Sequence, residues 1–136
     1  MYFTDAKWRR LTYSQINCKL GKKMLQSLGY QVIIAEDGVL AIEQIIRHDA
    51  TVDAILMDQS MPRKDGLTAT KEIRAMETDG TLSRTRPIIA VSAVVSTEAQ
   101  NLFRIAGADD FLAKPLSLGR LEQSLSTHLH VDNANV

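Results

Sequence analysis

Short apolar runs alternate along the chain with longer stretches in which apolar residues recur every three or four positions. The short runs, bounded by turn residues, are typical of buried strands, and the longer spacing is typical of amphipathic helices. The pattern predicts strands over residues 31–35, 53–57, 87–91 and 110–113. It predicts helices over residues 16–28, 39–46, 66–76, 97–106 and 118–129.

Strands that alternate with helices indicate an α/β fold with a doubly wound parallel sheet, because each connecting helix covers one face of the sheet. A first strand before residue 16 would make this sheet five-stranded. Turn chemistry supports the boundaries: Gly29 and Gly107 follow predicted helices, and Ser96 and Ser117 stand where N-caps belong. The sequence therefore predicts a single α/β domain.

The first strand is atypical. A strand covered on both faces is normally a continuous apolar run, and counting back from Ile16 this strand should end near Leu11. The adjacent Arg9 and Arg10 stand there instead, and burying an unpaired guanidinium is costly. Residues 1–4 would pass as a strand, but they need a longer connection over residues 5–15. We therefore treat residues 1–14 as an atypical segment with a degenerate or missing first strand.

Three groups suited to phosphoryl chemistry each close a predicted strand. Asp58 follows residues 53–57, Ser92 follows residues 87–91, and Lys114 follows residues 110–113. Open parallel sheets bind their ligands outside the carboxyl ends of the strands. A carboxylate there can act as a nucleophile, while a hydroxyl and an ammonium bind phosphoryl oxygens. Taken alone, Asp58 fits equally well as a turn-capping residue, so the combination carries the hypothesis.

The chain also carries a series of short motifs whose order and spacing are more specific than any one of them. They are Ile16-Asn17-Cys18-Lys19, Leu28-Gly29-Tyr30, Ile55-Leu56-Met57-Asp58, Met61-Pro62 with Gly66, Lys71-Glu72-Ile73-Arg74, Pro87-Ile88-Ile89-Ala90-Val91-Ser92-Ala93, Gly107-Ala108-Asp109-Asp110-Phe111 and Lys114-Pro115. In this order they resemble the receiver domains of two-component phosphorelays, most closely those of hybrid sensor histidine kinases. The resemblance covers residues 15–130 and leaves residues 131–136 as a flexible polar tail.

The resemblance implies a flavodoxin-like receiver fold and a role for each candidate residue. Asp58 would accept a phosphoryl group from the phosphohistidine of a histidine kinase or a histidine phosphotransfer protein. Lys114, held over the site by a cis bond to Pro115, would pair with a phosphoryl oxygen, and Ser92 would donate a hydrogen bond to it. Phe111 stands where the family has an aromatic switch residue, which moves into space that Ser92 opens. The domain would signal rather than act as an enzyme.

The resemblance also implies a divalent metal, usually Mg²⁺, bound by the phosphoacceptor, a backbone carbonyl two residues later and an acidic pair after the first strand. Asp58 and the carbonyl of Ser60 match this pattern. Thr12 and Tyr13 stand at the positions of the acidic pair, which is therefore absent. Because Mg²⁺ requires oxygen ligands in octahedral geometry, the expected site lacks two of its carboxylates.

Two explanations of the missing pair stay open. Asp5 would reach the site if residues 1–4 were the true first strand. Alternatively, the sequence up to about Gln15 is not native to the domain. Asp37 and Asp65 are poor substitutes, since one follows another strand and the other lies in a turn, and we interpret both as solvated loop acids.

Composition narrows the range of partners and compartments. The 16 acidic and 16 basic side chains balance, so there is no electrostatic case for nucleic acid or a membrane surface. The single cysteine, Cys18, excludes an internal disulfide, and no apolar run is long enough to span a bilayer, so we expect a cytoplasmic protein. We interpret His48, His128 and His130 as surface residues.

Dimers of such domains use their last two helices, and nothing in the sequence selects a homodimer.

Two alternatives remain beside the phosphoacceptor hypothesis. A pseudo-receiver would dock partners without being phosphorylated, and the absent acidic pair at Thr12 and Tyr13 favours it. A small flavodoxin-like enzyme or nucleotide binder would need a glycine-rich phosphate loop after the first strand, and residues 14–17 contain no glycine. Asn in place of Asp58 separates the first two hypotheses, because only the phosphoacceptor would lose its signal.

Overall fold

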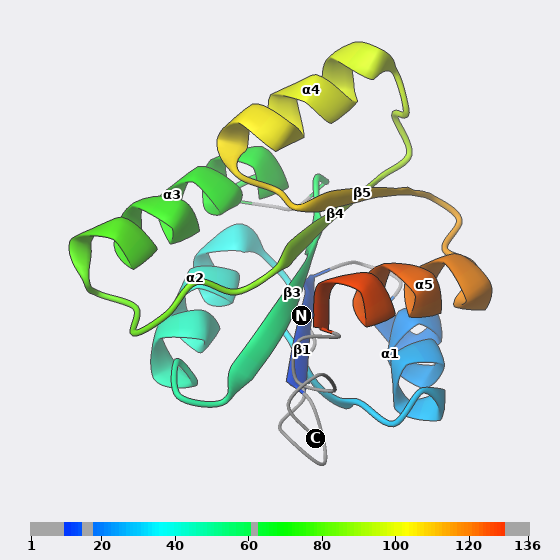
Figure 1. Ribbon diagram of the computed structural model, residues 1–136, viewed down its shortest axis with the longest axis horizontal. Coiled ribbons are helices and arrows are strands. Elements are labelled where there is room, and N and C mark those ends of the chain that lie inside the picture. Colours follow the sequence, from blue (N-terminus) through cyan, green and yellow to red (C-terminus); the bar gives the residue numbers. More distant parts are fainter. Residues whose placement is uncertain (1–9, 15–17, 61–62, 130–136) are drawn as a thin grey trace.

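The computed structural model describes residues 10–14, 18–60 and 63–129. Strands and helices alternate along this part of the chain (Figure 1). The strands are β1 (Arg10–Ser14), β2 (Gln31–Ile34), β3 (Val52–Asp58), β4 (Ile88–Ser92) and β5 (Asp110–Ala113). The helices are α1 (Cys18–Ser27), α2 (Gly38–Arg47), α3 (Gly66–Asp79), α4 (Thr97–Ala106) and α5 (Leu118–Leu129). Of these helices, none combines the length and the apolar character needed to cross a membrane.

The sheet is parallel, and its paired strands have the order β1-β3-β4-β5. β2 lies against β1, so the fifth strand is present, although its pairing within the sheet stays a prediction. Asp58 is the register partner of Val91, and Ser92 is the partner of Ala113. This register brings the carboxyl ends of β3, β4 and β5 to one edge.

The expected end of the first strand was wrong. The strand runs to Ser14 rather than stopping near Leu11, and Ser14 pairs with Met57, one residue before Asp58. Parallel pairing uses backbone groups alone, so β1 follows the ladder of β3 whatever its side chains are. The positions of the missing acidic pair, Thr12 and Tyr13, therefore lie inside the strand. Arg10 begins it, while residues 1–9, like the tail at 131–136, lie outside the described residues.

Two hydrophobic cores lie on opposite faces of the sheet, as a doubly wound fold requires. Alternate side chains of β3 enter different cores, since successive residues of a strand point to opposite faces. Ile55 and Met57 pack with α2 and α3, and Leu56 packs with α1 and α5. Figure 1 shows α2 and α3 on one side of the strands and α1 and α5 on the other. Because both faces of β3 are covered, the residue at its carboxyl end is held rigidly.

Helix ends follow the turn chemistry of the sequence. Ser96 is the N-cap of α4, and its hydroxyl accepts a hydrogen bond from the Ala99 N–H, as predicted. Ser117 accepts in the same way from Arg120 before α5. Gly107 ends α4 in the left-handed conformation with φ of 117°, which side chains other than glycine rarely adopt.

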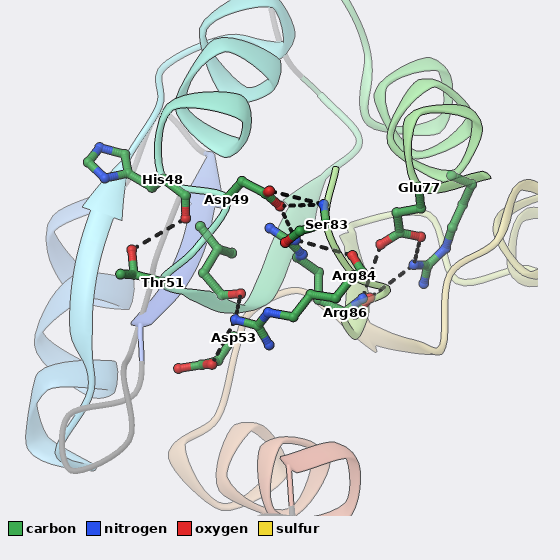
Figure 2. Close-up of polar contacts among 10 residues, drawn as sticks. His48, Asp49, Thr51, Asp53, Glu77, Ser83, Arg84 and Arg86 are labelled. Carbon is green, nitrogen blue, oxygen red and sulfur yellow. Dashed lines mark hydrogen bonds and ion pairs between the residues drawn. The ribbon is translucent and has the colours of Figure 1, made fainter. Parts of the chain in front are cut away.

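A polar cluster that the sequence did not predict lies at the amino ends of β3 and β4 (Figure 2). Asp58 is at the opposite end of β3. The centre of the cluster is Arg86, which is 1% exposed. One guanidinium nitrogen, Nη2, donates to Asp49 and to the carbonyl of Arg84, whereas Nε and Nη1 have no partner among the described residues. Arg84 in turn bonds to Asp53 at 3.1 Å, and Glu77 accepts from the Arg86 N–H at 3.0 Å. The cluster joins the connections that precede β3 and β4.

Arg74 of α3 links two of the sequence motifs. Its Nε donates to the carbonyl of Gly107 at 2.8 Å, and its Nη2 donates to Asp109 Oδ2 at 2.7 Å. The same Asp109 oxygen accepts from the Ile88 N–H at 2.9 Å. One side chain thus fastens α3 to the end of α4 and, through Asp109, to the beginning of β4.

Candidate functional site

Asp58 closes β3 and is 1% exposed. Its Oδ2 accepts a hydrogen bond from Lys114 Nζ at 2.7 Å, and its Oδ1 accepts from the Ser60 N–H at 3.0 Å. The first residue of α3, Gly66, packs closely against the end of β3. A Cβ on Gly66 would lie 2.2 Å from the Asp58 carbonyl oxygen, so glycine is required there. Two directed hydrogen bonds therefore fix the carboxylate at the sheet edge.

Lys114 reaches Asp58 because the backbone after β5 follows that of β4. The Lys114 N–H donates to the Ser92 carbonyl at 2.9 Å, which extends the ladder one residue beyond Ala113. The Lys114–Pro115 bond is cis, as the sequence predicted. The ammonium of Lys114 approaches the Asp58 carboxylate from the end of β5, so the acid and its cation come from distant parts of the chain.

Ser92 lies at the same edge, at the end of β4, and is buried. Its hydroxyl oxygen accepts a hydrogen bond from the Val94 N–H at 3.1 Å. A hydroxyl that accepts in this way keeps its hydrogen for donation to another group. Among the described residues Ser92 does not bond directly to Asp58. The fold thus brings the three predicted site residues together, two in contact and the third beside them.

Burial dominates the electrostatics of the carboxylate. It raises the pKa of Asp58 above the usual value of 3.8, and the bonds from Lys114 and Ser60 offset only part of the effect. Burial acts in this direction because a low-dielectric environment disfavours the charged form. Asp58 therefore holds a proton more readily than an exposed aspartate, and its charge depends on Lys114.

The residues that the structure describes do not complete a Mg²⁺ site. They supply the Asp58 carboxylate and the Ser60 carbonyl, and the described ranges contain no group of three or more acidic, histidine or cysteine side chains that could hold a metal. Mg²⁺ demands octahedral oxygen ligation, commonly from one or two carboxylates together with waters and phosphate oxygens. A single carboxylate that is already paired with Lys114 is therefore a poor ligand for Mg²⁺.

Asp37 was interpreted as a solvated loop acid, and this was wrong. It is 8% exposed, caps α2 by accepting from the Leu40 N–H at 2.8 Å, and accepts from Arg63 Nε at 2.8 Å. Burial raises the pKa of Asp37, but the bonds from Leu40 and Arg63 together outweigh it and hold the pKa below its usual value. Because these bonds hold the Asp37 carboxylate at the start of α2, it is not available as a metal ligand beside Asp58. Asp65 is an exposed N-cap of α3, so it is not a substitute ligand either.

A hollow of about 230 Å³ opens beside the site, lined by Ser60 and Ser92 on one side and by Leu102 and Phe103 of α4 on another. The predicted switch residue, Phe111, does not line it. Phe111 is half-buried and packs edge-on against Phe103, with ring centroids 5.8 Å apart. Phe103 was not among the predicted site residues, although its spacing from Ala99 and Ala106 places it on the inner face of α4.

The histidines are less exposed than the sequence suggested. His48 and His128 are half-buried, and His128 Nδ1 lies 2.8 Å from the Ser124 carbonyl. Ser124 itself is buried. His130 lies outside the described residues.

Comparison with known proteins identifies the family. Residues 14–126 match the model of the response regulator receiver domain. Hybrid signal transduction histidine kinase M of Dictyostelium discoideum is 37% identical over 106 residues, which are 78% of this chain and 4% of that protein. Two-component response regulator ORR41 of Oryza sativa subsp. japonica is 37% identical over 109 residues, 79% of this chain and 81% of that protein. The chain thus spans a small part of the hybrid kinase and most of the rice regulator.

A solved structure agrees with the sequence matches. The receiver domain of sensor histidine kinase PA1611 from Pseudomonas aeruginosa PAO1, which holds a magnesium ion in its active site cleft, superposes with a TM-score of 0.76 at 34% identity. The match covers 88% of this chain and 96% of that one. Matched over most of its length in sequence and fold, this chain belongs to the response regulator receiver domain family of two-component signalling.

Proposed function

We propose that the domain accepts a phosphoryl group from a phosphohistidine onto Asp58 and relays the signal within a phosphorelay. The observation that carries the proposal is the pairing of a buried strand-end carboxylate with Lys114 Nζ at 2.7 Å, beside the hydroxyl of Ser92. A structural ion pair alone would not require a second phosphate-binding group at the same edge. Such an arrangement suits phosphoryl transfer, in which positioning and charge stabilisation do most of the work.

In the proposed step, a carboxylate oxygen of Asp58 attacks the phosphorus atom. The P–N bond of the donor breaks, and its electron pair leaves with the imidazole, which takes up a proton. Lys114 moves its ammonium from the Asp58 carboxylate to a phosphoryl oxygen, and Ser92 donates its hydroxyl hydrogen to another. The Ser60 N–H continues to hold the aspartyl group, so the acceptor stays in place throughout the transfer.

In the proposed step, Mg²⁺ would be held by the Asp58 carboxylate and the Ser60 carbonyl and would contribute less charge neutralisation than Lys114. The PA1611 receiver coordinates magnesium, whereas the described residues here offer one carboxylate and one carbonyl. Charge neutralisation is therefore assigned to Lys114, which already faces Asp58. We propose that any Mg²⁺ binding by Asp58 and the Ser60 carbonyl is weak.

The donor would be a histidine kinase or a histidine phosphotransfer protein, and the chain itself would be a phosphoacceptor rather than an enzyme. The matches to hybrid kinases support this choice of donor. The balance of 16 acidic and 16 basic residues gives no electrostatic support for nucleic acid or a membrane surface as a partner. We propose a protein partner in the cytoplasm. A homodimer through the last two helices is compatible with the proposal and is not required by it.

A second function is favoured by one specific observation, the replacement of the acidic pair by Thr12 and Tyr13. In this case the domain would be a pseudo-receiver, a docking module that is never phosphorylated. The ion pair between Lys114 and Asp58 would then be a permanent structural contact. The two functions make opposite predictions for covalent modification of Asp58.

The test is the intact mass of the protein after incubation with phosphoramidate, with and without Mg²⁺. We expect a gain of one phosphoryl group in the wild type and none in Asp58→Asn. Ser92→Ala and Lys114→Met should slow the gain without removing the acceptor. If folded wild-type protein gains nothing under either condition, the phosphoacceptor function is wrong and the docking module remains. A gain that persists in Asp58→Asn would place the acceptor on another residue.

A further inference from the structure

Arg63 has an unusual backbone conformation. Its φ is 63°, and among the described residues it is the one residue other than glycine with a positive φ. This left-handed conformation brings Cβ close to the following carbonyl oxygen, so residues with a side chain rarely adopt it. Such a conformation persists only where the surrounding contacts hold it in place. The contacts of Arg63 therefore indicate what fixes the connection between β3 and α3.

Asp37, at the start of α2, supplies the contact that holds the Arg63 side chain. Nε and Nη2 of Arg63 each lie 2.8 Å from Asp37 Oδ2. The other carboxylate oxygen, Oδ1, accepts from the Leu40 N–H, so Asp37 is not free to turn with a moving partner. An ion pair with one exposed partner adds little to overall stability. It still fixes a direction, because two nitrogens converge on one oxygen of a buried residue.

The backbone beside this ion pair is closely packed as well. A Cβ on Gly38 would lie 2.1 Å from the Lys64 carbonyl oxygen, so the two backbones are in direct contact. The Lys64 ammonium pairs with Glu72 of α3. Residues 37–38 and 63–64 thus meet through one ion pair and one backbone contact, which fix the connection before α3 against the start of α2.

The same connection leads back to the phosphoacceptor. The Gly66 N–H donates to the Gln59 carbonyl at 3.2 Å, so the segment that follows Arg63 returns to the end of β3. Gln59 lies between Asp58 and Ser60 in the chain, and the Ser60 N–H donates to Asp58 Oδ1 at 3.0 Å. The course of the backbone at Arg63 therefore affects the direction in which the Ser60 N–H points.

We propose that Asp37 and Arg63 are positioning residues for the phosphoacceptor: their ion pair holds residue 63 in the left-handed conformation and thereby keeps the Ser60 N–H on the Asp58 carboxylate. The inference rests on the proposed function, because it concerns the rate at which Asp58 accepts a phosphoryl group. Among the described contacts, neither residue forms a hydrogen bond or ion pair with Asp58. Both act through the backbone, so the conformation at position 63 matters and the charge there does not. Glycine, which adopts a positive φ without strain, should therefore replace Arg63.

The test compares Arg63→Ala, Arg63→Gly, Asp37→Asn and a double variant that combines Asp37→Asn with Arg63→Gly. Asn at position 37 keeps an N-cap for α2 while removing the charge. Two quantities are measured: the rate of phosphoryl gain from phosphoramidate with Mg²⁺, followed by intact mass, and the chemical shift of the Ser60 amide. Thermal melts establish that each variant is folded, and the melting temperatures should stay close to that of the wild type, because the ion pair adds little stability.

Arg63→Ala and Asp37→Asn should each slow the phosphoryl gain at least about tenfold and shift the Ser60 amide, because a small misplacement of a reacting group is costly. Arg63→Gly should keep the wild-type rate and amide shift. In the double variant, glycine at position 63 should rescue the loss caused by Asn at position 37. A purely structural cap, or a role of the Asp37 charge alone, predicts no such rescue.

The inference is overturned if Ala and Gly at position 63 give equal rates, because φ at that position would then not matter. It is also overturned if the double variant is as slow as Asp37→Asn. Wild-type protein that gains no phosphoryl group is a separate result, because it overturns the proposed function and this inference together.

Discussion

The ammonium of Lys114 and the carboxylate of Asp58, 56 positions apart in the chain, meet at 2.7 Å with unequal access to water. The Asp58 side chain is 1% exposed, whereas that of Lys114 is 23% exposed. The acid therefore depends on its partner more than the base does. Loss of the base leaves a buried charge, while loss of the acid leaves an ammonium that can still be hydrated.

Lys114→Met should destabilise the protein at neutral pH by roughly 3 kcal/mol, the low end for breaking a buried ion pair. In the Asp58→Asn background the same substitution should cost far less, since no charge is stranded. Urea unfolding of the wild type, both single variants and the double variant measures the coupling. Equal losses in the two backgrounds would mean that the contact contributes nothing to stability.

Asp58→Asn should raise the melting temperature near pH 7. Burial raises the pKa of Asp58 in the folded state, so its stabilising contribution is present below the unfolded value of about 4 and is lost as pH rises through the folded pKa. The ionised carboxylate at neutral pH is therefore a cost that Asn removes. The advantage of Asn should shrink on acidification toward about pH 4. Thermal melts across this range check the sign, and an advantage that grows on acidification would contradict it.

Asp49→Ala should be the more damaging change in the buried polar cluster. Among the residues that the structure describes, it removes the one acidic side chain that contacts the Arg86 guanidinium, and this should cost about 3–5 kcal/mol. Arg86→Met, by contrast, should be neutral or stabilising, because it replaces a buried guanidinium with two unpartnered nitrogens by an apolar side chain. Denaturant unfolding ranks the two variants. A larger loss for Arg86→Met would show that the guanidinium makes contacts beyond those described.

Restoring the acidic pair should restore the metal site. The variant with Thr12→Asp and Tyr13→Asp should bind Mg²⁺ at least about tenfold more tightly, because the number of charged ligands tunes the affinity of such sites. The Ser60 amide, next to the expected metal, reports the titration. The matched control carries Asn at both positions, which keeps the size of the side chains without the charge. Equal affinity in the Asp and Asn variants would mean that these positions do not face the metal.

The sequence predicted those features of the fold that depend on local spacing. The helix over 97–106 and its Ser96 cap were correct, because a cap and an apolar periodicity act within a few residues. The three site residues were brought together as predicted, since the carboxyl ends of neighbouring parallel strands share one edge. The predicted order of strands and helices was therefore sufficient to place these three residues at one edge of the sheet.

The failures concern contacts between distant positions. The true end of β1 at Ser14 follows from pairing with β3, which no local pattern encodes. Asp37 looked like a loop acid because Arg63, its partner 26 positions away, carries no signal in the sequence. Arg86 stands among charged and polar residues, so nothing indicated that it would be buried. The contact between Phe103 of α4 and Phe111 of β5 likewise joins two elements that no local pattern pairs.

Arg74 and Gly107 lie in contact, and the Arg74 side chain fills the space that a side chain at position 107 would need. A Cβ at position 107 would approach the Arg74 Cγ to 2.5 Å, and the positive φ at this position independently favours glycine. Glycine at position 107 is therefore required twice, by its φ and by the Arg74 side chain. In a chimera that takes α3 from this domain and α4 with β5 from another receiver, the second parent therefore has to supply glycine at position 107. Compatibility across the junction between α3 and α4 thus depends on a single backbone position.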